Sequence, residues 1–304
     1  MLVHVLGSAA GGGFPQWNCN CPQCSGVRSG RIRATPRTQS SLAVSDDGVR
    51  WALINASPDI RAQIDRFPRL NPGAPVRASA IAAVVLMDSQ IDHTTGLLSL
   101  REGRQLTVHC TEMVRQDLTS GFPLLTMLGH YATVRVETIP IADGSGFTVD
   151  GIPHLRFTAI PLSSKAPPYS PHRHDPHLGD NIGLRIVDTR SGGRLFYAPG
   201  LGAPDAAVRA EIAAADAVMV DGTCWHDDDM ARAGVGGKRA REMGHLPLSG
   251  AGGMLAELSA CPRPRKILIH INNTNPILDE ESPERRELTA AGIEVAFDGL
   301  EISL

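Results

Sequence analysis

Short runs of consecutive apolar residues, rich in β-branched side chains, recur along the chain. The clearest runs cover residues 81–87, 217–220 and 267–269. Strands that are buried on both faces have this composition, because neither face is exposed to water. The chain also begins with an apolar run that predicts a first buried strand. A hairpin is predicted at 41–56 with its turn at 45–48, and further strands are expected at 105–109, 134–139, 155–160, 182–187 and 194–198.

Three segments between these strands carry helix start and stop signals. Residues 203–214 begin with a proline in the first turn, residues 248–260 end just before Pro262, and residues 282–292 open with Ser-Pro-Glu. Strands that alternate with helices predict an α/β fold. No repeat of fixed period and no low-complexity linker divides the sequence, so we expect a single domain over residues 1–304.

One long segment, residues 161–179, lacks helix and strand periodicity and is rich in proline and histidine. Long ordered loops of this kind usually cover a functional site. We therefore expect this segment to be a lid loop. His172, His174 and His177 form a histidine-rich tract that could bind metal, but their loose spacing favours the lid.

Composition and charge narrow the classes of function. The 304 residues are 42% hydrophobic, with 29 basic and 32 acidic residues and a net charge of −3. Nothing resembles the basic stripe of a nucleic-acid-binding protein. No apolar run approaches the ~20 residues of a membrane-spanning helix, and the amino-terminal stretch lacks the basic leader of an export signal. The sequence therefore predicts a cytoplasmic protein with no membrane span and no nucleic-acid partner.

Ionisable residues follow three of the predicted buried strands. Asp92 and His93 come shortly after the first of the clear apolar runs, Asp221 after the second and His270 after the third. Ligands in open α/β sheets collect at the carboxyl ends of strands, and ionisable groups beside an apolar core must be paired or bind metal. The four side chains therefore predict one metal site. Two histidines and one carboxylate leave positions open for substrate and oxygen on iron(II), whereas zinc on the same donors would activate water.

The order of these motifs resembles the metallo-β-lactamase superfamily, whose first metal motif reads His-x-His-x-Asp-His. The aligned residues 88–93 read Asp-x-Gln-x-Asp-His, while Asp221 and His270 match the superfamily's bridging aspartate and last histidine. The superfamily's middle histidine is also absent, because the matching stretch offers Ser163 and Ser164. The resemblance implies an αββα sandwich. The missing histidines imply a mononuclear site, which makes a dinuclear hydrolase doubtful.

Longer strings resemble the family of B proteins of pyrroloquinoline quinone (PQQ) biosynthesis, and they lie at 7–24, 88–102, 165–173, 180–184, 197–201, 220–230 and 243–250. This resemblance implies iron- and oxygen-dependent hydroxylation of the tyrosine ring of a PQQ precursor, which derives from a cross-linked glutamate and tyrosine of a peptide. Two alternatives stay open: a carrier of PQQ or its precursor that assists transport to the periplasm, and a zinc-dependent hydrolase. The implied partners are the small-molecule or dipeptide precursor and other PQQ-biosynthesis proteins, and a homodimer stays open.

Three of the six cysteines crowd into residues 19–24, namely Cys19, Cys21 and Cys24. A turn of this length can present three sulfurs to one tetrahedral ion, as in structural zinc sites. We therefore predict a structural zinc knuckle. A phosphodiesterase branch of the superfamily completes a similar knuckle with a histidine, at a position where this chain has Asn273. The fourth ligand stays open among His4, another histidine and water.

Four more side chains belong to the predicted site. His245 lies near the point where hydrolytic relatives use a histidine in catalysis, so we expect it to support the metal ligands or to transfer a proton. Lys165, Tyr169 and Arg173 lie on the lid loop. Because cationic donors bind carboxylates strongly, we expect these three to bind a substrate with several carboxylates.

Overall fold

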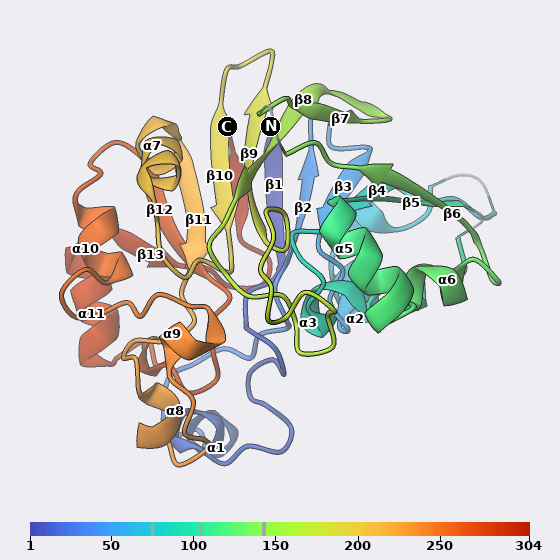
Figure 1. Cartoon of the computed structure of the whole chain (residues 1–304). Coiled ribbons are helices and arrows are strands. Elements are labelled where there is room, and N and C mark those ends of the chain that lie inside the picture. The colour runs from blue at the N-terminus through green and yellow to red at the C-terminus, as the bar shows by residue number, and fades with distance from the viewer. Residues whose placement is uncertain (74–75, 104, 142–143) are drawn as a thin grey trace.

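Two seven-stranded β-sheets pack face to face in the computed structural model, which describes residues 1–73, 76–103, 105–141 and 144–304 (Figure 1). The first sheet contains, in spatial order, β14 (Glu301–Ser303), β1 (Leu2–Gly7), β2 (Ser41–Ser45), β3 (Trp51–Ile54), β4 (Ile81–Val85), β5 (Gln105–Cys110) and β6 (Thr133–Thr138). The second contains β13 (Ile293–Val295), β12 (Arg265–Ile269), β11 (Ala217–Asp221), β10 (Arg194–Ala198), β9 (Ile182–Asp188), β8 (Ile152–Pro161) and β7 (Phe147–Val149).

Helices cover the outer face of each sheet. Those packed on the first sheet are α2 (Ile60–Arg66), α4 (Leu97–Leu100), α5 (Glu112–Gln116) with the π-helical turn η2 (Asp117–Gly121), and α6 (Leu124–Leu128). Those packed on the second sheet are α7 (Ala206–Ala214), α10 (Met254–Ser259) and α11 (Pro283–Ala290). The short helices α1 (Pro22–Ser29), α8 (Asp229–Arg232) and α9 (Ala240–Met243) lie beyond one end of the sheets, opposite the two termini (Figure 1). Within the described ranges, no helix is long and apolar enough to cross a bilayer.

Strand β11 shows why the clear apolar runs predict buried strands. Ala217 and Met219 point into the core between the two sheets, whereas Val218 and Val220 point into the core between the second sheet and its helices. All four side chains are fully buried, because successive side chains of a strand face opposite sides and both sides are covered here. The two sheets with their outer helices confirm the predicted αββα sandwich.

The predicted strands are all present, but one predicted helix begins six residues late. Helix α10 starts at Met254 instead of 248. Leu248 is buried and its backbone N–H donates to the Cys224 carbonyl at 2.9 Å, and Gly250 and Gly252 have positive φ angles of 86° and 67°. These contacts and backbone angles form a turn, so the apolar residues at 246–253 fill the core without forming a helix.

The segment expected to be a lid loop, residues 161–179, connects β8 to β9 and contains neither helix nor strand after Pro161. The loop packs against α5 and η2. The Ser170 hydroxyl donates to the buried Asp117 carboxylate at 2.5 Å, and the Thr111 hydroxyl donates to the Gly179 carbonyl at 2.7 Å. The loop is therefore tied to the first sheet's helices along its length.

Candidate functional site

The carboxyl ends of β4, β11 and β12 meet at a cavity of about 220 Å³. Asp88 and the short helix α3 (Ile91–Thr94) follow β4, Asp221 is the last residue of β11, and His270 directly follows β12. His270 has a φ of 60°, a backbone conformation that a non-glycine residue adopts only where surrounding contacts stabilise it. The three strand ends therefore converge as the sequence predicts.

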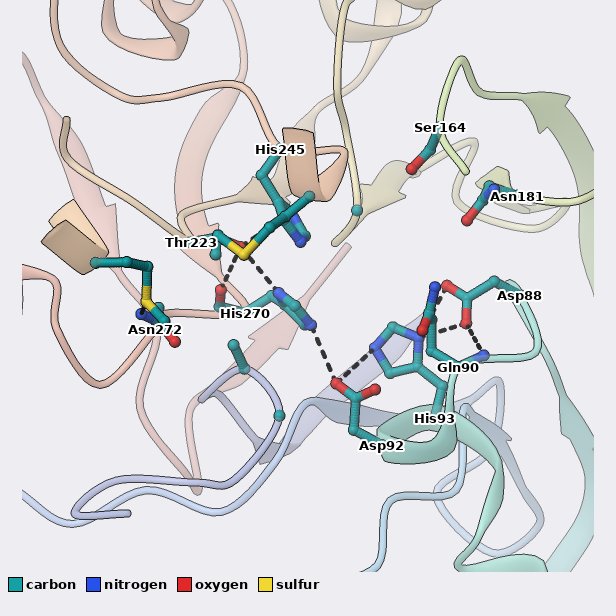
Figure 2. Close-up of a pocket in the computed structure, with 15 residues that line it drawn as sticks. Asp88, Gln90, Asp92, His93, Ser164, Asn181, Thr223, His245, His270 and Asn272 are labelled. Carbon is teal, nitrogen blue, oxygen red and sulfur yellow. Dashed lines mark hydrogen bonds and ion pairs between the residues drawn. The ribbon is translucent and has the colours of Figure 1, made fainter. Parts of the chain in front are cut away.

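Asp92, His93 and His270 place their potential ligand atoms within 4.8 Å of one another. The Asp92 Oδ2 atom lies 3.5 Å from His270 Nε2 and 4.0 Å from His93 Nε2, and Figure 2 shows both rings directed towards it. Burial alone would raise the pKa of Asp92, but the two imidazoles outweigh burial and hold this pKa well below its usual range. Asp92 is thus an anion between two imidazole nitrogens, which is the two-histidine, one-carboxylate donor set.

The Asp88 carboxylate orients the His93 ring. Its Nδ1 atom lies 2.8 and 2.9 Å from the two Asp88 carboxylate oxygens, whereas its Nε2 atom is buried and has no hydrogen-bond partner among the described residues. Burial lowers the pKa of His93, but the charges of Asp88 and Asp92 outweigh burial and raise it to about 9. A carboxylate on Nδ1 and a free Nε2 are characteristic of metal-binding histidines.

Asp221 contacts His245 directly. Its Oδ2 atom lies 2.6 Å from His245 Nδ1 and also accepts the Leu201 N–H at 2.9 Å, while Oδ1 accepts the Thr223 N–H at 2.9 Å. Burial alone would raise the pKa of this fully buried carboxyl, but the His245 charge and hydrogen bond lower it. Asp221, His245 and His270 form a second group with ligand atoms within 4.8 Å of one another. His245 therefore lies at the centre itself, stacked 5.3 Å from the His270 ring.

Thr223 links the two histidines on this side of the cavity. Its hydroxyl donates to the His270 backbone carbonyl at 2.9 Å, and its oxygen lies 3.0 Å from His270 Nδ1 and 3.2 Å from His245 Nδ1. Because the hydroxyl proton is used on the carbonyl, the oxygen accepts the N–H of His270 Nδ1. The lone pair of His270 is then on Nε2, the atom that faces Asp92.

These residues fit a bound metal ion. The unpartnered, buried Nε2 of His93 would carry an energetic cost without a ligand, and an oxygen atom lies next to Nδ1 of each of His93, His245 and His270. Gly11 lies against the same centre, because a Cβ atom at this position would approach Asp92 Oδ2 to 3.2 Å. The choice of ligands, and Asp221 as one of them, stays a prediction.

The three knuckle cysteines also come together. The sulfurs of Cys19, Cys21 and Cys24 lie within 4.8 Å of one another in a buried cluster. The Asn273 amide nitrogen lies 3.1, 3.7 and 3.4 Å from these three sulfurs in turn, so Asn273 occupies the side on which a fourth ligand is expected. His4 lies elsewhere, stacked 3.7 Å from the Phe67 ring and 3.2 Å from Glu301. No histidine joins the cluster among the described residues.

The three lid-loop residues expected to bind substrate do not line the described cavity. The Tyr169 hydroxyl donates to the Ser89 carbonyl and Arg173 donates to the Ala166 carbonyl, while Lys165 Nζ lies 3.4 Å from the Glu242 carbonyl. Tyr169 and Arg173 thus hold the loop in place, and substrate binding by the three residues stays a prediction.

Sequence reasoning gave no role to several residues that line the cavity, among them Ser164, Asn181 and Thr223. Asn181 directly precedes one predicted strand and Thr223 closely follows another, and Ser164 lies in the stretch that matches the superfamily's middle histidine. These sequence positions indicate that the three residues lie near the site, but they do not reveal which way a neutral side chain points.

Comparison with known proteins identifies the family of the chain. The Beta-lactamase superfamily domain matches residues 50–271. The coenzyme PQQ synthesis protein B of Azotobacter vinelandii is 63% identical over 304 residues, which are all of both chains. The crystal structure of Zn²⁺-bound PqqB from Methylobacterium extorquens aligns over all of both chains with a TM-score of 0.90 and 40% identity.

A diphosphatase of the PhnP family aligns over 100% of this chain and 97% of its own with a TM-score of 0.68, but at 18% identity this likeness concerns the fold alone. The alignment with the PQQ synthesis proteins extends over the complete sequence. The chain therefore belongs to the coenzyme PQQ synthesis protein B family of the β-lactamase superfamily.

Proposed function

We propose that this chain hydroxylates the tyrosine-derived ring of a PQQ precursor in a reaction that uses iron(II) and oxygen. The observation that carries the proposal is the Asp92, His93 and His270 set, whose donor atoms lie within 4.8 Å of one another at an open cavity. Two histidines and one carboxylate leave positions free for substrate and oxygen. The relatives' role in PQQ synthesis supplies the substrate class.

The size of the cavity supports a ring-sized reacting group. A cavity of ~150 Å³ is enough to hold a benzene ring, so about 220 Å³ accommodates one phenol side chain with a small molecule beside it. Met230 and Met243 also line the cavity, and thioethers make favourable contacts with aromatic rings. A complete fused-ring cofactor would extend beyond the described wall.

The chain's own residues would orient the reactants and hold protons. Asp92, His93 and His270 would hold the iron, while Asp88 and Asp221 fix the His93 and His245 rings through Nδ1. Iron(II) bound there would supply the one-electron chemistry that oxygen needs to react with a closed-shell ring. His245, backed by the buried Asp221 carboxylate, would accept or release a proton at the cavity wall.

Each hydroxylation replaces a ring C–H by C–O–H. It consumes one O₂ together with two electrons and two protons, and it releases one water molecule. The electrons come from an added two-electron reductant such as ascorbate. The knuckle cysteines take no part in this reaction, and we propose that they hold a structural zinc ion.

The test uses protein loaded with iron(II) without air and then given oxygen, ascorbate and glutamyl-tyrosine. We expect oxygen uptake and a product heavier by one oxygen atom per turnover. His93→Ala should abolish the reaction, while His174→Ala, an exposed lid-loop change, should preserve it. Binding of the dipeptide without oxygen uptake would favour the carrier, and product formation with zinc alone would favour a hydrolase.

We also propose that the protein acts in the cytoplasm together with other proteins of PQQ synthesis. Its proposed partners are the dipeptide precursor and those proteins. Fractionation of cells that express the tagged chain tests the location. Sedimentation of the purified protein tests the homodimer.

A further inference from the structure

Three neutral polar side chains in the cavity wall have no hydrogen-bond partner. They are Gln90, which precedes α3, Ser164 of the lid loop, and Asn181, which precedes β9. Among the described residues, none of these three side chains donates or accepts a hydrogen bond, and the Asn181 amide nitrogen is buried. Figure 2 shows Ser164 and Asn181 on the Asp88 side of the cavity, away from Thr223 and Asn272.

The polar groups on the other side of the cavity are all partnered. Thr223 bonds to His270, and the Asn272 amide donates to Thr274 at 2.6 Å and to the Met230 sulfur at 3.4 Å. The unpartnered groups are thus confined to one part of the wall. An unpartnered buried polar group is costly, so a ligand that bonds to the buried Asn181 amide gains affinity, and it can also bond to the half-exposed Gln90 and Ser164 side chains.

The charges around the three side chains limit what this ligand can be. The described wall contains the carboxylates of Asp88 and Asp92 and no lysine or arginine. Lys165 follows Ser164, but its side chain is exposed and its amine lies by the Glu242 carbonyl. Apart from the metal ion and the histidines of the centre, a carboxylate ligand would therefore lie beside two carboxylates with no lysine or arginine in the described wall to pair with it. A hydroxyl or carboxamide can both donate to and accept from amides and hydroxyls.

We infer that Gln90, Ser164 and Asn181 form a subsite for an uncharged oxygen of the substrate, the phenolic hydroxyl of the tyrosine-derived ring. This inference rests on the proposed function and adds the contact that would fix which ring carbon faces the metal ligands. Gln90 stands at a position, and Ser164 in a stretch, where the superfamily pattern has a metal-binding histidine. The positions of a missing second metal thus hold the substrate in place.

The test measures binding to the zinc-loaded protein by calorimetry, so that no turnover occurs. Glutamyl-tyrosine is compared with glutamyl-phenylalanine, which lacks only the hydroxyl. Two hydrogen bonds of ordinary strength predict about tenfold tighter binding of the tyrosyl peptide. Glutamyl-4-carboxyphenylalanine, which carries a charge at the same place, should bind more weakly than the phenylalanyl peptide.

Variants assign the preference to these residues. Asn181→Ala and Ser164→Ala should each reduce the tenfold preference to about threefold or less, and Ser164→Ala is a half-exposed change that threatens the fold little. Asn272→Ala is the matched control, because it removes an amide from the opposite wall and should keep the preference. Thermal melting of each variant checks that it is folded.

The outcomes separate this inference from the proposed function. A preference that depends on Asn181 and Ser164, without any hydroxylation by the iron-loaded protein, would uphold the subsite and refute the proposed reaction. Equal binding of the two dipeptides, a preference that both variants keep, or no binding of either dipeptide would overturn the subsite, whatever the iron-loaded protein does.

Discussion

Replacing Thr223 by valine tests how the metal ligands are oriented. Valine has nearly the same shape but lacks the hydroxyl, so it removes the bond to the His270 carbonyl at 2.9 Å and the contact with His270 Nδ1 at 3.0 Å. A neutral hydrogen bond contributes about 0.5–1.5 kcal/mol, so two contribute about 1–3 kcal/mol. Loss of a group that hydrogen-bonds to a metal ligand typically lowers metal affinity 10–100-fold, which is about 1.4–2.8 kcal/mol. The free energy of the two hydrogen bonds thus matches the free energy that corresponds to the expected loss of metal affinity.

The assay uses cobalt(II), whose visible spectrum reports the geometry of its ligands. Sulfur ligands give cobalt a separate charge-transfer band, so binding at Cys19, Cys21 and Cys24 can be followed in the same sample as an internal reference. We expect Thr223→Val to bind active-site cobalt 10–100-fold more weakly against a competing chelator, while Thr223→Ser restores the affinity. An unchanged affinity and an unchanged visible spectrum in the valine variant would refute the orienting role.

Three further changes have defined outcomes. Gly11→Ala should lower active-site metal content measured by elemental analysis, because its new Cβ would come within 3.2 Å of Asp92 Oδ2, and full occupancy would contradict this. Cys24→Ala should lower the melting temperature by more than Cys261→Ala, since Cys261 lies outside the sulfur cluster; equal effects would count against a structural knuckle. Burial lowers the pKa of His109, so the unfolded chain takes up this proton first as the pH falls and stability is lost below about pH 6.5. His109→Phe should reduce the fall in unfolding free energy between pH 7 and 5, measured by urea titration, and an identical fall in both proteins would refute this sign.

The strands could be predicted because burial on both faces requires apolar residues at successive positions of the sequence. Runs such as Val218 to Val220 have no polar residue, since each face packs against a separate core. The edge strands β7, β13 and β14 were not predicted, because three residues carry too little pattern and pair only where a neighbouring strand is already in place. The late start of α10 has a similar origin, because apolar residues before it fill the core as a turn.

The ionisable residues of the site could be predicted from the sequence, but their hydrogen-bond partners could not. Asp92, His93 and His270 follow predicted strands, so topology alone brings them together. That Asp221 bonds to His245 depends on the path of the chain from β11 to α9, which no local pattern records. Asp88 likewise appears in the sequence as a departure from a histidine motif, and only the folded chain shows it bonded to His93.

The segment from His270 to Asn273 connects the two clusters of potential ligands. One end of these four residues carries an imidazole of the cavity, and the other places an amide over the three sulfurs, where the Cys21 thiol also donates to the Asn273 carbonyl at 3.4 Å. Oxidation of the thiols would displace Asn273 and, through two intervening residues, the ring of His270. Damage at a distant sulfur can thus disturb the metal ligands of the cavity without touching them.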